Sequence, residues 1–269
     1  MDNFYTTPDI NKKRIKKFLD AGKRFDGRKL DEFRDIQIEL GVSKKAEGSC
    51  RVKIGKTEVI VGVKMDIGTP YADSANKGNL MTTAELTPLS SPRFEAGPPK
   101  FPAIELGRVI DRGIRESKII DFEKLCIKEG EKVWTVFVDI YSINDDGNLM
   151  DAAGIGAMVA LKNARMPKYD EKTGKVIYGE LTDEKLPLAK DIPLAITVHK
   201  IGKNIIVDPT REEEDISESR VTIGISSGVI SSMQKGEATP LTQEELEQMF
   251  ETADNVWNTI FKKIEKFVK

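Results

Sequence analysis

A strand-like segment, a tight polar turn and a small-residue helix follow one another between residues 133 and 164. Residues 133–143 are rich in β-branched and aromatic side chains, residues 152–164 favour a buried helix, and the turn between them reads NDDGNLM over residues 144–150. A strand that passes through a tight turn into a helix brings free backbone N–H groups and the positive end of the helix dipole together. The segment therefore predicts the backbone architecture of an anion site.

The side chains of this turn do not match that architecture. A phosphate site of this kind also needs a hydroxyl group and a cationic fork in the turn. Leu149 and Met150 stand where those groups are needed. The turn thus has the outline of a phosphate pocket without its chemistry.

The rest of the chain alternates strand hairpins with helices. Helices are predicted over residues 9–19, 103–117 and 152–164, and a last helix begins at the capping box TQEE of residues 242–245. Strands are predicted over residues 36–40, 49–54, 57–66, 80–86, 125–143, 194–201, 204–207, 221–225 and 230–234. This order predicts an α+β fold with helices packed on β-sheets.

Composition changes divide the chain into four segments. Residues 1–30 form a basic helical arm, which we expect to be solvated, and residues 31–166 form a first domain. Residues 167–190 are polar and rich in turns and charges, and they are predicted to be a linker. Residues 191–269 form a second domain that ends in the C-terminal helix.

Composition restricts the function as well. A net charge of −2 across 269 residues argues against an extended basic surface, so any contact with RNA must come from a local patch. Cys50 and Cys126 are expected to be core thiols, and together with His199 they cannot form a zinc site. No metal or cofactor is predicted. The N-terminal residues are polar and basic and no apolar run is long enough to span a membrane, which predicts a cytoplasmic protein without a membrane partner.

Several short motifs occur in an order and spacing that resemble one known family. They are GR at 27–28 after the basic helix, IGTPY at 67–71, IELGR at 104–108, DG at 146–147, and VDPT at 207–210 before EEE at 212–214. Over nearly its whole length the chain resembles the ribonuclease PH family, and most of all the non-catalytic, ribonuclease PH-like subunits of the archaeal exosome core. The resemblance implies the ribonuclease PH-like fold, which is of the ribosomal protein S5 domain 2-like kind.

The resemblance gives the turn at residues 146–150 a specific meaning. Active family members carry Asp-Gly-Gly-(Ser/Thr)-Arg there, and the hydroxyl and the arginine hold the inorganic phosphate that attacks the 3′ end of RNA. Asp146 and Gly147 fit this pattern, whereas Asn148, Leu149 and Met150 depart from it. The resemblance therefore implies a degenerate phosphate turn and no catalytic residue.

The acidic segment after residue 207 departs from the family pattern too. Active members carry one aspartate after this strand and a second one six residues later. Asp208 fits the first position, but Glu214 stands at the second, where its extra methylene would misplace a general acid. Binding of a divalent ion by this acidic cluster is one alternative, and a solvated acidic turn is the simpler one.

Three arginines share one face of the helix predicted over residues 103–117. Arg108, Arg112 and Arg115 are spaced four and three residues apart, and such a face is either solvated or binds phosphate groups. The resemblance favours binding of RNA phosphates, since the inactive subunit of the exosome ring contributes arginines from this helix to the RNA path of its partner. Arg93, in the long loop before the helix, is a secondary RNA-binding candidate beside the alternative of a solvated arginine.

The resemblance implies a function and a set of partners. It predicts a non-catalytic component of the archaeal exosome, a 3′-to-5′ phosphorolytic RNA-degrading ring. The ring would consist of three heterodimers of this chain with a catalytic ribonuclease PH-like subunit. RNA and RNA-binding cap proteins would be the other partners. In that ring the chain would structure the partner's active site and contact RNA phosphates. Two alternatives stay open: a divergent phosphorolytic exoribonuclease that is active alone, and a purely structural ring subunit.

Overall fold

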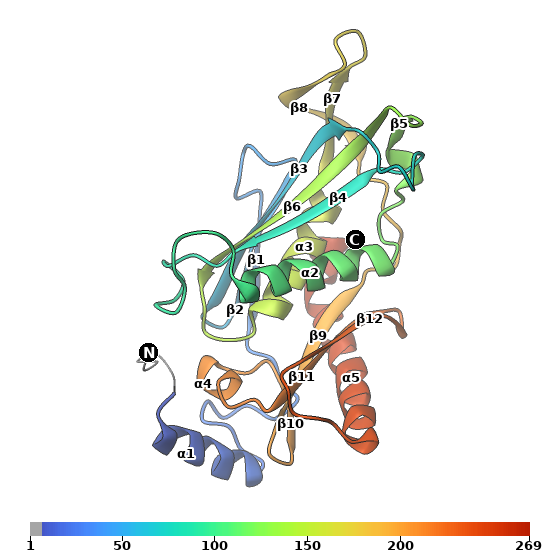
Figure 1. Cartoon of the computed structure of the whole chain (residues 1–269). Coiled ribbons are helices and arrows are strands. Elements are labelled where there is room, and N and C mark those ends of the chain that lie inside the picture. Colours follow the sequence, from blue (N-terminus) through green and yellow to red (C-terminus); the bar gives the residue numbers. More distant parts are fainter. Residues whose placement is uncertain (1–6) are drawn as a thin grey trace.

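The first sheet begins with an antiparallel hairpin whose strands bury alternate side chains. The computed structural model describes residues 7–269, and Figure 1 shows this sheet above the second one. It contains β1 (Ile36–Leu40), β2 (Gly48–Ile54), β3 (Thr57–Gly68), β4 (Asn79–Glu85), β5 (Cys126–Lys128) and β6 (Lys132–Asn144). The strand order is β1-β2-β3-β6-β4, and β5 pairs with β6. Helix α2 (Phe101–Glu116) packs on β4 and connects it to the rest of the sheet, where β4 runs parallel to β6.

The second sheet is smaller and entirely antiparallel. It consists of β9 (Leu194–Ile201), β10 (Asn204–Val207), β11 (Ser219–Ser226) and β12 (Val229–Gly236), in the order β10-β9-β11-β12. The short helix α4 (Arg211–Glu214) follows β10, and the long C-terminal helix α5 (Gln243–Val268) packs on β9 and β11. The predicted capping box starts α5: the Glu245 N–H donates to the Thr242 hydroxyl at 3.2 Å.

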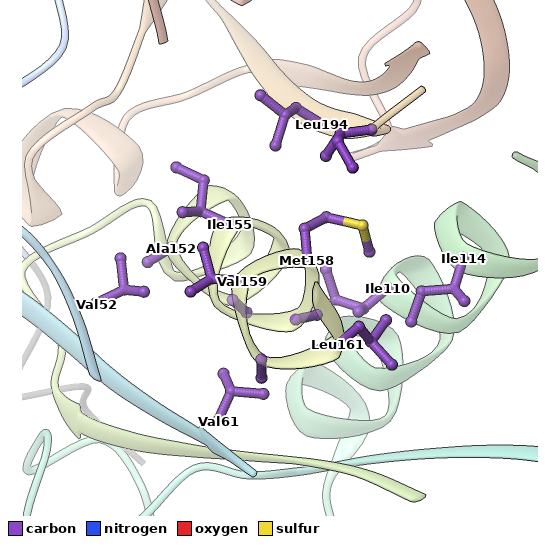
Figure 2. Packing of buried hydrophobic residues seen from close by; sticks show 14 of the residues in the cluster. Val52, Val61, Ile110, Ile114, Ala152, Ile155, Met158, Val159, Leu161 and Leu194 are labelled. Atoms are coloured by element: carbon purple, nitrogen blue, oxygen red, sulfur yellow. The ribbon is translucent and has the colours of Figure 1, made fainter. Parts of the chain in front are cut away.

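Helix α3 (Leu149–Asn163) lies in the centre of the core and joins the two sheets. It contacts β2 and β3 of the first sheet, β9 of the second, and helices α2 and α5. Figure 2 shows Ile155, Met158 and Val159 of α3 among side chains from both sides, including Val52 and Leu194. Small residues permit this close packing: a Cβ atom added at Gly156 would lie 2.6 Å from Val61 Cγ2. The predicted α+β fold is therefore built around one shared hydrophobic core.

The N-terminal helix α1 (Asp9–Asp20) also packs on the second sheet. Its buried residues Ile15 and Leu19 form a separate apolar cluster with Ile201, Ile206 and Ile216. The helix was predicted as a solvated amphipathic arm, and it is amphipathic, but its apolar stripe is covered by the second sheet, so only its polar face is solvated. The first six residues of the predicted arm lie outside the described residues.

Most of the predicted elements are present with small shifts at their ends. The predicted strand 125–143 is wrong in one respect, since the chain turns at residues 129–131 and splits it into β5 and β6. Gly130 makes this turn with a φ of +72°, a conformation that a glycine adopts without strain. The short 3-10 helix Glu123–Leu125 precedes β5.

A two-stranded ribbon occupies much of the segment that was predicted to be a linker. Strands β7 (Arg165–Asp170) and β8 (Lys175–Lys185) pair antiparallel and project from one end of the molecule (Figure 1). Both strands carry charged side chains, such as Lys168 and Glu180, which form an exposed ion pair at 2.9 Å. No helix within residues 7–269 combines the length and the apolar character needed to cross a bilayer.

Candidate functional site

Helix α3 starts inside the sequence that was predicted to be the phosphate turn. Leu149 and Met150 form the first helical residues, and Asn148 is the N-cap, with φ 62° and ψ 38°. Gly147 has a φ of +83°, and a Cβ atom there would lie 2.6 Å from the backbone of Pro209 and Thr210. The turn is thus pressed against the acidic segment that follows β10, so the two sequence motifs meet in space.

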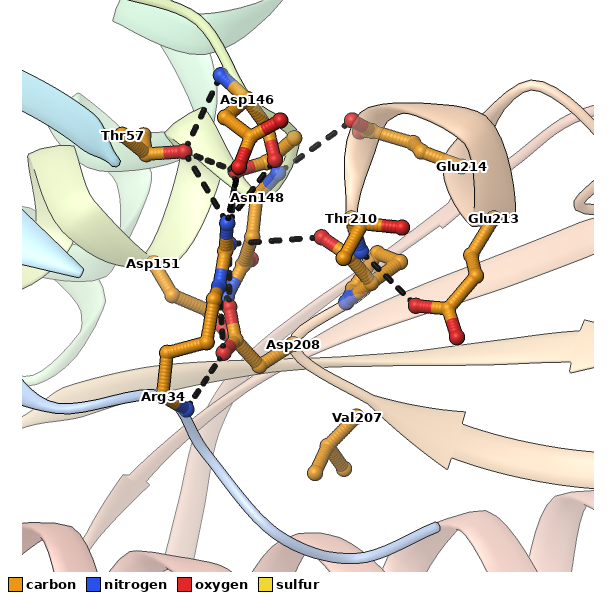
Figure 3. A network of polar contacts seen from close by, with 12 residues as sticks. Arg34, Thr57, Asp146, Asn148, Asp151, Val207, Asp208, Thr210, Glu213 and Glu214 are labelled. Carbon is orange, nitrogen blue, oxygen red and sulfur yellow. Dashed lines mark hydrogen bonds and ion pairs between the residues drawn. The ribbon is translucent and has the colours of Figure 1, made fainter. Parts of the chain in front are cut away.

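Arg34 connects these two motifs, and Figure 3 shows it between them. Its guanidinium donates from Nη2 to Asp208 Oδ1 at 2.7 Å and from Nε to Asp208 Oδ2 at 2.9 Å. The same side chain donates from Nη1 to the Asp146 carbonyl at 2.9 Å and from Nη2 to the Gly147 carbonyl at 3.0 Å. Because its planar fork serves both motifs at once, Arg34 fixes their relative position.

Asp208 is fully buried and accepts hydrogen bonds from three side chains. Besides Arg34, Arg28 Nη1 donates to Oδ2 at 2.9 Å and Asn148 Nδ2 donates to Oδ1 at 2.8 Å. The Arg34 backbone N–H adds a bond of 2.8 Å to Oδ2. Burial alone would raise the pKa of this carboxyl, but the hydrogen bonds and the charge of Arg34 outweigh it and lower the pKa. Asp208 is therefore an ionised structural carboxylate with no proton to donate at neutral pH.

The prediction of a solvated acidic turn is wrong. Glu213 is buried and forms an ion pair with the Arg24 guanidinium, which is also buried. Arg24 further donates to the Val207 carbonyl at 3.0 Å and to the Asp208 carbonyl at 2.7 Å. Thr210 and Glu213 close a capping box at the start of α4. These residues form a packed segment because every buried charge has a partner of opposite sign.

Glu214 brings a carboxylate to the N-terminus of α3. The Asn148 backbone N–H donates to Glu214 Oε2 at 3.2 Å, and Arg211 Nη1 lies 3.1 Å from the same oxygen. Arg211 also donates to Asp145 Oδ2 at 3.2 Å. Burial and the nearby Glu214 raise the pKa of Asp145 against the opposing effect of Arg211. The positive end of the helix is thus already occupied by an anion of the chain itself.

Arg93, the secondary RNA-binding candidate, is held by an ion pair. Its Nη1 and Nη2 atoms donate to the two carboxylate oxygens of Asp215 at 2.5 and 2.6 Å. The Thr7 hydroxyl donates to Asp215 Oδ2 at 2.7 Å. Burial opposes ionisation, yet these hydrogen bonds and the nearby Arg211 lower the pKa of Asp215 to about 2. The structure thus pairs Arg93, in the loop before α2, with the acidic segment.

Asp151, in the first turns of α3, is a buried carboxyl group that sequence reasoning missed. Thr197 donates to its Oδ1 from the backbone at 2.9 Å and from the hydroxyl at 2.7 Å. Its Oδ2 is buried without a hydrogen-bond partner in the described part of the chain. Burial raises the pKa of this group to about 7, against the opposing hydrogen bonds from Thr197.

The three arginines of α2 lie on its exposed face, as predicted. Arg115 Nε donates to Asp111 Oδ2 at 2.6 Å, which is the intrahelical pair expected for a solvated face. Arg112 Nη1 donates to Gln234 Oε1 of β12 at 3.1 Å. Arg108 and Arg112 form no ion pair with an acidic side chain among residues 7–269, so their charges remain available.

A cleft lies beside the N-terminus of α3. Leu149 and Met150 line it, together with Arg211, Glu214 and His199. His199 is a buried residue of β9, and its Nδ1 atom lies 3.0 Å from the Ser217 hydroxyl. Burial lowers the pKa of His199 to about 3, so the ring is neutral. Among residues 7–269, no group of three or more His, Cys, Asp or Glu side chains is arranged to hold a metal ion.

Residues 32–167 match the model described as 3′ exoribonuclease family, domain 1, and residues 191–256 match domain 2 of the same family. The chain belongs to the 3′ exoribonuclease family. This result confirms the resemblance to the ribonuclease PH family and the fold that it implied.

Curated relatives within the 3′ exoribonuclease family support this membership. The chain is 48% identical to Exosome complex component Rrp42 of Methanothermobacter thermautotrophicus, over 89% of this chain and 88% of that protein. It is 46% identical to the protein of the same name from Pyrococcus furiosus, over 100% of this chain and 95% of the relative.

Solved structures of the family share the fold. A chain of the Archaeoglobus fulgidus exosome with RNA bound to the active site is 41% identical, with a TM-score of 0.88 over 95% of this chain and 98% of that one. A chain of an archaeal exosome core is 38% identical, with a TM-score of 0.83 over 96% of this chain and 97% of that one.

Proposed function

We propose that this chain is a non-catalytic subunit of the archaeal exosome, a 3′-to-5′ phosphorolytic RNA-degrading ring. The observation that carries the proposal is the state of the phosphate turn. Leu149 and Met150 begin α3 where active family members hold phosphate, and the Glu214 carboxylate accepts a hydrogen bond from the Asn148 N–H at the same helix end.

Two physical effects oppose phosphate binding at this turn. The apolar side chains of Leu149 and Met150 offer no hydrogen bond and no positive charge to an oxyanion. The Glu214 carboxylate repels a second anion, and it already accepts the N–H that phosphate would use. Phosphorolysis needs phosphate as the nucleophile, so we infer that this chain has no catalytic activity of its own.

The acidic site supports the same proposal. A general acid must release a proton near neutral pH, but Asp208 has a lowered pKa and accepts hydrogen bonds from Arg34, Arg28 and Asn148. Glu214 and Asp215 are both held by arginines. We infer that these carboxylates stabilise the fold and do not transfer protons.

The proposed role is to complete the ring. The chain would pair with a catalytic ribonuclease PH-like subunit, three such heterodimers would form the hexamer, and RNA-binding cap proteins would attach to it in the cytoplasm. Obligate interfaces of this kind bury on the order of 2,000 Å² or more. The exposed arginines Arg108, Arg112 and Arg115 would contribute RNA-phosphate contacts to the partner's active site.

Phosphorolysis of a poly(A) RNA by the chain alone, by its catalytic partner alone and by both together tests the proposal. We expect no nucleoside diphosphate from the chain alone and efficient release by the assembled complex. The divergent-enzyme alternative predicts phosphate-dependent release by the chain alone. If such release occurs and the isosteric Glu214→Gln variant abolishes it, the proposal is refuted.

A further inference from the structure

The exposed face of α2 carries apolar residues next to its arginines. Phe101 is 74% exposed and Ile104 is 49% exposed, at the N-terminal end of the helix. A shallow groove between α2 and β12 is lined by Phe101, Ile104, Glu105, Arg108, Val109, Arg112 and Gln234. Phe101 and Arg108 are seven residues apart, which places them on the same side of the helix about 10 Å apart along its axis.

The groove carries net positive charge. Its acid, Glu105, is neutralised by Arg220, whose Nη2 donates to Glu105 Oε2 at 2.6 Å. Arg112 donates to the neutral amide of Gln234, and Arg108 forms no ion pair with residues 7–269. An anion with apolar parts therefore complements this surface better than a purely apolar partner does.

The exposed ring of Phe101 lies at the first residue of a helix. Phe101 begins α2, Pro99 lies two residues before it, and Pro102 follows it directly. Proline is well suited to the first turn of a helix, so Pro102 supports the start of α2 at this position. A large aromatic ring is thus presented to solvent from the start of α2.

We propose that Phe101 is a stacking platform for a base of single-stranded RNA, with Arg108 and Arg112 binding the neighbouring phosphates. This inference rests on the proposed function and adds a residue that recognises the base to residues that recognise the backbone. Aromatic side chains bind single strands in this way because every base has a stacking face, whereas arginines follow the charge of the backbone.

Binding of fluorescently labelled A-rich and U-rich single-stranded RNA to the assembled complex with the catalytic partner tests this inference. Phe101→Ala should weaken binding of A-rich RNA by roughly 5- to 100-fold and of U-rich RNA by less, because preferences at such sites follow stacking strength. The salt dependence should stay unchanged, because no phosphate contact is removed. Phe101→Trp should retain the affinity, and Tyr178→Ala serves as the matched aromatic control, because Tyr178 is exposed on β8 outside this groove.

The outcomes separate the two proposals. If Phe101→Ala binds both RNAs like the parent complex while Arg112→Ala binds them more weakly, the stacking inference is overturned and the proposed RNA contact remains. If neither variant changes RNA binding, the RNA contact of α2 fails as well. If Phe101→Ala dissociates the complex in gel filtration, the groove holds a protein surface, which also overturns the inference.

Discussion

Replacing Asp208 by asparagine removes one negative charge from the centre of the buried network. Asp208 Oδ1 accepts from Arg34 Nη2 and Asn148 Nδ2, and Oδ2 accepts from the Arg34 N–H, Arg34 Nε and Arg28 Nη1. In either orientation, the amide of an asparagine would therefore point its NH2 group at two or three donors. The variant would leave Arg34, whose side chain is 9% exposed, without its closest charged partner, and the more exposed Asp146 carboxylate would remain at 3.4 Å.

The expected loss of stability is large. Removing one partner of a buried ion pair costs about 3–5 kcal/mol, because the remaining charge stays buried. For a chain of this size, 1 kcal/mol shifts Tm by about 2–4 °C, so we expect Tm to fall by roughly 6–20 °C. Asp208 accepts five hydrogen bonds, but their separate free energies cannot be summed, because contacts to one carboxylate do not contribute independently. We therefore keep the estimate for a single buried ion pair.

Thermal unfolding followed by circular dichroism at pH 7 measures this effect. Asp254→Asn is the matched control, because it makes the same chemical change at an exposed position of α5. The difference between wild type and Asp208→Asn should also depend on pH. The pKa of Asp208 is lowered in the folded chain, so its stabilisation is present above the unfolded pKa of about 3.9 and is lost as pH falls through the folded pKa.

The reasoning would be refuted by a small effect. If Asp208→Asn lowers Tm no more than Asp254→Asn does, the network does not hold the two motifs together. A large loss of Tm that persists unchanged at pH 2 to 3 would show that the side chain acts through shape and not through charge.

Three further outcomes follow from other parts of the structure. Arg112→Ala in the assembled complex should weaken the binding of A-rich and U-rich RNA equally, and it should make the slope of the logarithm of the binding constant against the logarithm of the salt concentration shallower by about one. The exposed-site control Lys262→Ala should change neither quantity. Gly147→Ala should destabilise the chain by more than about 1 kcal/mol in urea unfolding, because φ is +83° and the added Cβ meets the backbone of Pro209. Asp151 has a pKa raised to about 7 by burial, so its charging destabilises the fold as pH rises from about 4 to 7. Asp151→Asn should therefore gain stability relative to wild type over this range, and a difference that is constant with pH would contradict the assignment.

The elements with a clear local pattern could be predicted from the sequence. The hairpin of β2 and β3 and that of β9 and β10 were placed closely, because alternating apolar residues flank a Gly-Lys turn in each. The capping box fixed the start of α5 in the same way. The ribbon of β7 and β8 was missed because its few core-facing apolar residues, such as Met166, Tyr169 and Val176, stand among many charged ones, so no regular alternation distinguishes it from a loop.

The candidate site was predictable only in part. The phosphate turn and the acidic segment carry local motifs, and both were found. Arg34 carries none, since its partners Asp146 and Asp208 lie 112 and 174 residues away along the chain. The burial of Glu213 depends on Arg24 in the same way. Such pairings are set by the tertiary fold, so a charged run in the sequence does not distinguish a solvated turn from a buried network.

The network around Asp208 bears on how sites of this kind can diverge. Leu149 and Met150 line a cleft and also contact the hydrophobic core, where apolar side chains of several kinds can supply similar packing. Asp208 has no such freedom, because two arginines and the helix N-cap depend on its charge. A site can therefore lose its phosphate ligands while an acid that resembles a catalytic residue persists for structural reasons. The presence of that acid in a member of this family is not, by itself, a sign of catalysis.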